Sequence, residues 1–176
     1  MPRRIAFDID GVLADTTSEL VGQEELEPGT IARLATIAAE RRWEVIFLTK
    51  RPESDGVTAQ RQTQHWLRSK GYTLPSVFVV KGSRGPIAAA LGLDIVVDAR
   101  PEHCLDVVGQ RRSRAQAVLV WRGDKAQLPS AARHAGISIV GSVGECLDIL
   151  IRMDGSTPRV IDRVKRLFGL KEPVSV

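Results

Sequence analysis

Two aspartates, Asp8 and Asp10, stand one residue apart at the end of an apolar run, and Gly11 follows directly. If the run is a β-strand, residues i and i+2 point to the same side, so the two carboxylates lie together. Like charges this close persist only where a cation or a reaction needs them. The pair therefore predicts a site for a cation or for acid–base chemistry. A simple turn at Asp10 and Gly11 would leave Asp8 unexplained.

Polar side chains also follow three later apolar runs. Thr49, Lys50 and Arg51 follow the second, Lys81 the third and Asp98 the fourth. Because ligands bind beyond the carboxyl ends of the strands in open α/β sheets, we expect these residues to share one crevice. Carboxylates attract Mg²⁺, and hydroxyl and ammonium groups bind phosphate oxygens. Together they predict phosphoryl transfer.

The elements that must position these residues alternate along the chain. Near-continuous apolar runs are typical of parallel strands that are buried on both faces. We expect strands over Arg4–Phe7, Glu44–Leu48, Ser76–Val80, Asp94–Val97, Ala117–Trp121 and Ser138–Val140. Helices are expected from Pro28, over about Val57–Arg68, over Ile87–Leu91, from Pro101, near Ser130–His134, after the capping box Ser142–Glu145, and from Pro158. This alternation predicts a doubly wound, three-layer α/β sandwich with a mostly parallel sheet.

The length of 176 residues suits a single core. The stretch Asp154–Pro158 reads as a hinge, so we expect a core over residues 1–153 and a C-terminal helix and tail over residues 154–176. The two cysteines, Cys104 and Cys146, each lie in an apolar helical pattern, which predicts buried reduced thiols rather than a disulfide or a metal site.

The composition, with 43% hydrophobic and 26% charged residues, is typical of a soluble globular protein. There is no apolar run of bilayer length and no signal-peptide core, so we expect a cytoplasmic protein without a membrane partner. The net charge of +4 favours anionic partners such as phosphate esters, nucleotides or nucleic acid.

The strand-end residues resemble the four motifs of the haloacid dehalogenase (HAD) superfamily. Phe7–Asp15 resembles the first motif, Phe47–Thr49 the second, Lys81 the third and Ile95–Asp98 the fourth. Their order and their places at strand ends agree with that family, and the similarity spans residues 5 to about 108.

Two details narrow the resemblance. The sequence of residues 8–15, with Thr49–Pro52, is similar to the deoxyribonucleotidase-like branch. Thr63–Arg68 also resembles a stretch of polynucleotide phosphatase domains.

The resemblance implies a Mg²⁺-dependent phosphatase that acts through an aspartyl-phosphate. Asp8 would be the nucleophile, and Asp10 would protonate the leaving oxygen and then deprotonate the hydrolytic water. Magnesium would bind Asp8, the backbone carbonyl of Asp10, and Asp98. Asp98 could instead cap the helix that begins at Pro101.

The remaining motif residues would handle the phosphoryl group. Thr49 would hydrogen-bond a phosphoryl oxygen, and Lys81 would offset negative charge, with Lys50 as its competitor for that role. Gly11 would let the chain turn sharply beside the phosphate. Gly11, Lys50 and Arg51 are therefore assigned to substrate binding.

Other polar residues have simpler interpretations. Arg51, Arg84 and Arg100 either meet a substrate phosphate or are solvated. His65, His103 and His134 lack metal-ligand spacing, which favours surface or partly buried positions. Arg122–Asp124 reads as a turn after a strand.

The fourth motif departs from the family pattern, because Ala99 stands where many members carry a second acid. Glu102, one helical turn further on, could replace that acid through a metal-bound water. The segments after the first motif and after Lys81 are too short for a separate cap domain, which predicts an open site. A neighbouring subunit or the helix from Pro158 could then serve as a lid.

These observations favour a phosphomonoester hydrolase that acts on a nucleotide-like substrate. One alternative is a phosphatase of nucleic-acid ends, which the open site and the basic clusters favour. The other is a non-catalytic HAD-fold binding protein, for which Ala99 is the main support.

Overall fold

The computed structural model describes residues 2–16, 20, 22–54 and 56–155. Within these residues six strands form one sheet in which every neighbouring pair is parallel, in the order β3-β2-β1-β4-β5-β6. The strands are β1 (Arg4–Asp8), β2 (Glu44–Thr49), β3 (Ser76–Val79), β4 (Ile95–Asp98), β5 (Gln116–Val120) and β6 (Ser138–Val140). The predicted strands and the parallel sheet are confirmed.

Helices connect the strands, as the alternation predicted. They are α1 (Thr30–Arg41), α2 (Ala59–Ser69), α3 (Arg84–Leu91), α4 (Pro101–Gly109), α5 (Ser130–His134) and α6 (Val143–Gly155), with a short 3₁₀ helix η1 (Lys125–Gln127). The Ser142 hydroxyl accepts the Glu145 N–H at 3.0 Å, and the Glu145 carboxylate accepts the Gly141 N–H at 2.8 Å. This pairing satisfies backbone N–H groups at the start of α6 and explains why the helix begins there.

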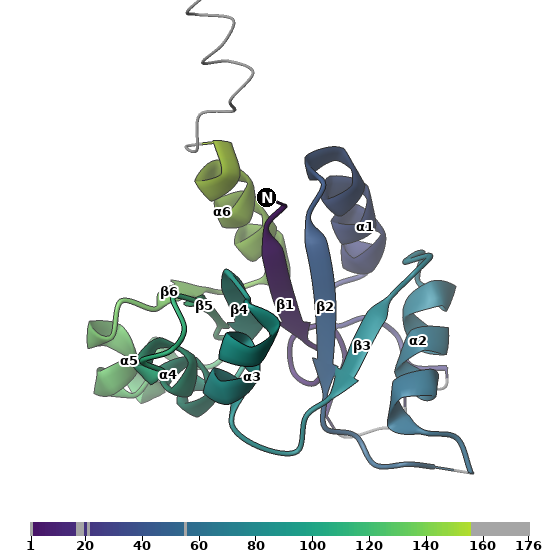
Figure 1. Ribbon diagram of the computed structural model, residues 1–176, viewed down its shortest axis with the longest axis horizontal. Helices are drawn as coiled ribbons and strands as arrows, with labels where there is room; N and C mark the ends of the chain where they lie inside the picture. Colours follow the sequence, from purple (N-terminus) through teal and green to yellow (C-terminus); the bar gives the residue numbers. More distant parts are fainter. Residues whose placement is uncertain (1, 17–19, 21, 55, 156–176) are drawn as a thin grey trace, which may run out of the picture. The chain divides into compact units, whose positions relative to one another are not determined.

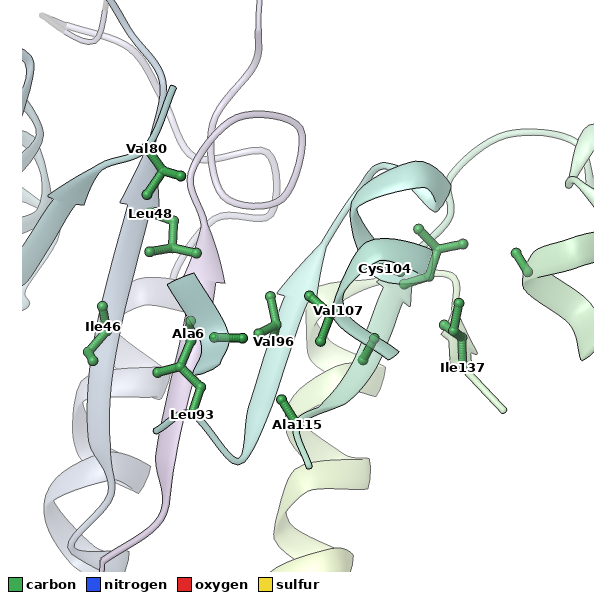
Figure 2. Packing of buried hydrophobic residues seen from close by; sticks show 14 of the residues in the cluster. Ala6, Ile46, Leu48, Val80, Leu93, Val96, Cys104, Val107, Ala115 and Ile137 are labelled. Carbon is green, nitrogen blue, oxygen red and sulfur yellow. The ribbon is translucent and has the colours of Figure 1, made fainter. Parts of the chain in front are cut away.

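The sheet is buried on both faces because successive strand residues point to opposite sides. On one face Ala6, Ile46 and Val96 belong to a buried cluster that also contains residues of α3, α4 and α5. Figure 2 shows Val107 of α4 beside Val96. Cys104 lies fully buried in the same cluster as a free thiol. On alternate positions of the strands, apolar residues such as Phe7, Phe47 and Val97 are also buried.

The strand order places β1 between β2 and β4, with their carboxyl ends at the same edge (Figure 1). Phe7 is aligned with Val97, and Asp8 with Leu48. Asp8, Thr49 and Asp98 are the last residues of these three strands. The sheet therefore brings residues that are up to 90 positions apart in the sequence to one edge.

Neither of the segments in which a cap was considered contains an inserted subdomain among its described residues. The described residues between β1 and α1 form turns and loops. The four residues 80–83 separate β3 from α3 and contain no extra strand or helix. The fold is therefore that of a sandwich without a large cap, as expected. Among the described helices, none combines the length and the apolarity needed to cross a lipid bilayer.

The chain divides into two compact units, residues 1–146 and 147–176. All residues with predicted catalytic, substrate-binding or metal-binding roles lie in the first unit. The boundary expected at residue 154 stays a prediction, and the helix expected from Pro158 lies outside the described residues.

Candidate active site

Asp8 ends β1 and is almost completely buried, with 1% of its surface exposed. Its Oδ1 atom accepts a hydrogen bond from Nη2 of Arg84 at 2.7 Å. Burial and the nearby charge of Asp98 raise the pKa of Asp8 from 3.8 to about 8, while Arg84 acts in the opposite direction and Asp10 adds to the rise. A carboxyl group in such a setting is poised to bind a cation, because a positive charge would favour its ionised form.

Asp98 ends β4 and is fully buried beside the same guanidinium group. Its Oδ1 accepts the N–H of Arg100 at 2.9 Å, just before α4. Its Oδ2 lies 2.8 Å from Nδ1 of His103 and 3.5 Å from Nε of Arg84. The contact with the Arg100 N–H, just before α4, is one that a helix-capping residue could make. A role in capping alone would not explain the contacts of Asp98 with Arg84 and His103.

Arg84 is the basic residue of the site, and the sequence interpretation left its role open. It lies in the first turn of α3, which begins three residues before the expected start at Ile87. The side chain is 1% exposed, contacts Asp8 and Asp98, and donates to the carbonyl of Val80 at 3.3 Å. Lys81 is exposed in the loop before α3. Arg84 thus makes the contact with the nucleophile position that the resemblance assigned to Lys81.

Asp10 lies in the turn after β1 and is 4% exposed. Its Oδ1 accepts a hydrogen bond from Nε of Arg51 at 2.6 Å. Its Oδ2 is buried and has no hydrogen-bond partner among the described residues. Gly11 follows with a φ of 81°, a conformation that side chains disfavour, and its N–H donates to the carbonyl of Ala14 at 2.7 Å. The turn therefore holds Asp10 close to Asp8 with one oxygen unsatisfied.

Thr49 ends β2 and is fully buried. Its hydroxyl accepts the backbone N–H of Arg51 at 3.2 Å. Arg51 contacts Asp10 and also donates to the carbonyl of Asp15, whereas Lys50 is exposed. Of the residues assigned to phosphate and substrate binding, Arg51 contacts Asp10, and Thr49 is bonded to the backbone of Arg51. Lys50 faces solvent.

Arg122 follows β5 and holds the turn of the first motif by hydrogen bonds. Its guanidinium donates to the carbonyls of Gly11 at 2.6 Å and Val12 at 3.1 Å, and it pairs with Glu27. Glu27 also accepts the N–H groups of Val143 at 2.8 Å and Gly144 at 3.0 Å. From the sequence, Arg122 was predicted only to lie in a turn after a strand. No local sequence pattern predicts its contact with a residue 110 positions away.

The donor set fits a divalent cation. Asp8, Asp98 and His103 each offer one ligand atom, and these atoms lie within 4.8 Å of one another. Two carboxylates with water ligands are what Mg²⁺ prefers, and the unsatisfied oxygen of Asp10 adds negative potential nearby. Glu102, the expected substitute for a second acid, is exposed, and the residue of this turn in contact with Asp98 is His103.

No protein-family model and no curated protein matches the sequence. Solved structures do match. D,D-heptose 1,7-bisphosphate phosphatase from B. bronchiseptica, complexed with magnesium and phosphate, aligns with a TM-score of 0.58 at 15% identity, over 86% of this chain and 99% of that one. The D,D-heptose 1,7-bisphosphate phosphatase from Burkholderia thailandensis aligns with a TM-score of 0.55 at 16% identity, over 84% and 98%. The chain therefore shares the fold of these two phosphatases.

Proposed function

We propose that this protein is a phosphomonoester hydrolase that acts through an aspartyl-phosphate and uses a divalent cation such as Mg²⁺. The observation that carries the proposal is the buried Asp8, which lies at a strand end among Arg84, Asp98 and the unsatisfied carboxylate of Asp10. Two phosphatases share the fold, and one was solved with magnesium and phosphate.

In the first step an oxygen of Asp8 attacks the phosphorus, and the bond from phosphorus to the ester oxygen breaks. Asp10 donates its proton to the leaving oxygen. For this the contact between Nε of Arg51 and Oδ1 of Asp10 must open when the substrate enters, so that Asp10 can reach the leaving oxygen. Substrate phosphate oxygens are suitable new partners for Arg51.

In the second step water attacks the phosphorus of the aspartyl-phosphate, and Asp10, now a carboxylate, accepts the proton of the water. The bond between phosphorus and Asp8 breaks, which returns the carboxylate of Asp8 and releases inorganic phosphate. Arg84 lies against Asp8 throughout and offsets charge on the nucleophile and the phosphoryl group. Thr49 is buried at the end of β2, the strand next to β1, and can donate its hydroxyl proton to a phosphoryl oxygen.

A divalent cation would be held by Asp8 and Asp98 and by the backbone carbonyl of Asp10. When bound it supplies charge neutralisation between the nucleophile and the phosphoryl oxygens. Its positive charge would also favour the ionised, nucleophilic form of Asp8, whose pKa burial otherwise raises.

The substrate class that we propose is a phosphorylated small molecule, with a nucleotide-like compound as the first choice because of the motif sequence at residues 8–15 and 49–52. The two phosphatases of the same fold act on a sugar bisphosphate by their names. Sugar phosphates therefore belong in the same screen as mononucleotides.

The test is a hydrolysis assay of the full chain with an aryl phosphate, then with mononucleotides, sugar phosphates and 5′-phosphorylated oligonucleotides, with and without Mg²⁺. We expect activity that depends on Mg²⁺ and a loss of at least about 1,000-fold in Asp8→Asn, because no covalent intermediate can form. Asp124→Asn is the matched control, since Asp124 is exposed and outside the site. Wild-type activity in Asp8→Asn would refute the mechanism.

The same screen separates the alternatives. Preference for oligonucleotides with strong dependence on salt would favour a phosphatase of nucleic-acid ends. Absence of both hydrolysis and cation binding would favour a non-catalytic binding protein.

A further inference from the structure

His103 lies in the first turn of α4, at the edge of the acid cluster. Its Nδ1 atom is 2.8 Å from Oδ2 of Asp98, and 17% of its side chain is exposed while Asp98 is fully buried. The imidazole therefore spans the distance between a buried carboxylate and the surface.

The spacing of the three donors suits coordination of a single ion. One ligand atom each from Asp8, Asp98 and His103 lies within 4.8 Å of the others. A cation with ligand distances of about 2.0–2.2 Å holds its ligands roughly 3–3.6 Å apart. Small side-chain rotations would close the set around one ion without moving the strands that carry the acids.

The cluster contains more acidic than basic groups. Three buried carboxyl groups, those of Asp8, Asp10 and Asp98, face two guanidinium groups, those of Arg84 and Arg51. Oδ2 of Asp10 is buried and lacks a hydrogen-bond partner among the described residues. An unsatisfied buried carboxylate oxygen is costly unless positive charge lies near it.

The two positions after Asp98 at which an acid was expected, 99 and 102, place no carboxylate at the site. Ala99 follows Asp98 and packs against the first-motif turn, where a Cβ placed on Gly11 would lie 3.1 Å from its Cβ. Glu102 is exposed. The side chain of His103, by contrast, places Nδ1 at 2.8 Å from Oδ2 of Asp98.

We propose that His103 is a direct ligand of the metal ion, so that the site of Asp8, Asp98 and His103 favours a transition metal such as Co²⁺, Zn²⁺ or Fe²⁺ more than an all-oxygen site would. This inference rests on the proposed metal-dependent function and adds a nitrogen ligand to the oxygen ligands named there. Imidazole nitrogen suits these ions, whereas Mg²⁺ prefers oxygen.

The first test measures cation affinity by titration calorimetry on the full chain, without substrate. In His103→Asn, which keeps a hydrogen-bond donor near Asp98, we expect Co²⁺ affinity to fall about tenfold or more and Mg²⁺ affinity to change less than about twofold. His134→Asn is the control, because His134 is exposed on α5 and bonds the carbonyl of Ser130. It should bind both ions as the wild type does.

The second test has a readout on the wild type alone. Electron spin-echo spectroscopy of the wild type with bound Mn²⁺ should show coupling to a ¹⁴N nucleus. The coupling should be absent in His103→Asn. Two results would overturn the inference: no ¹⁴N coupling in the wild type, or equal losses of Co²⁺ and Mg²⁺ affinity in His103→Asn. Equal losses would mean that His103 orients Asp98 through a hydrogen bond.

These outcomes are separable from failure of the proposed function. If the wild type binds no divalent cation and hydrolyses no phosphate ester, both proposals are wrong. If it binds cations and hydrolyses esters but shows no nitrogen ligand, only the assignment of His103 is wrong.

Discussion

At the scale of single residues, the basic side chain that contacts Asp8 comes three positions later in the sequence than the family resemblance implies. Lys81 and Arg84 both follow β3, but Lys81 is exposed and Arg84 is buried against Asp8 and Asp98. A buried arginine is rare unless it is paired, and this one has two carboxylates as partners. We therefore infer that Arg84 offsets the charge of the nucleophile.

Replacement of Arg84 should affect catalysis far more than replacement of Lys81. We expect Arg84→Lys to lower kcat about 10-fold and Arg84→Ala about 100-fold or more, because a donor aimed at developing charge is lost. Lys81→Ala should cost much less. Steady-state kinetics with an aryl phosphate measures this, and circular dichroism checks the fold. A larger loss in Lys81→Ala than in Arg84→Ala would restore the role implied by the family resemblance.

The raised pKa of Asp8 predicts how Mg²⁺ stabilises the protein at different pH. The folded protein keeps a proton on Asp8 that the unfolded chain releases near pH 3.8, so without a cation stability falls as the pH rises towards about 8. A cation competes with that proton. The rise in Tm on addition of Mg²⁺ should therefore be larger at about pH 8.5 than at about pH 6.

Thermal denaturation at several values of pH, with Mg²⁺ or with a chelator, measures the effect. In Asp8→Asn the rise in Tm should be small and nearly independent of pH. A rise in Tm that is larger at low pH in the wild type would contradict the assignment of Asp8 as a cation ligand.

At the scale of elements, the sequence predicted the six strands and most helices, because each has its own pattern of apolar residues and its own end signals. The start of α3 was missed because Gly85-Pro86 reads as a turn, whereas proline is also tolerated in the first turn of a helix. That error hid Arg84. His103 and Arg122 were missed for another reason: their partners are contacts of the tertiary structure that no local pattern encodes.

The pair Arg122 and Glu27 connects three segments that are distant in the sequence. Arg122 holds the carbonyls of Gly11 and Val12, and Glu27 accepts the first N–H groups of α6. Partial burial acts to raise the pKa of Glu27, but these N–H groups and Arg122 outweigh it and hold that pKa below its usual value. The pair should therefore stabilise the turn that carries Asp10.

Glu27→Gln should lower the free energy of unfolding by about 1 kcal/mol near pH 7, which corresponds to a few degrees in Tm. Because the folded pKa is lowered, the contribution of Glu27 is present above its ordinary pKa of 4.5 and is lost as the pH falls below it. The difference between variant and wild type should therefore shrink in acid. Thermal melts of Glu27→Gln and of the control Glu53→Gln, an exposed residue, test this. A difference that grows in acid would contradict it.

At the scale of the whole molecule, the described residues form a sandwich without a large cap, and the site residues with defined contacts lie between Asp8 and Arg122. We expect a chain truncated after Gly155 to retain kcat and KM for an aryl phosphate within about twofold. A large rise in KM would instead support the alternative in which the C-terminal segment acts as a lid.

The buried guanidinium of Arg84 has a consequence for how the protein matures. Because Arg84 already stands between Asp8 and Asp98 as a built-in counter-ion, the polypeptide can collapse before it meets any metal. Small zinc-dependent domains behave differently, since they are unfolded when apo. We therefore expect the protein to fold without a cation and to bind one afterwards.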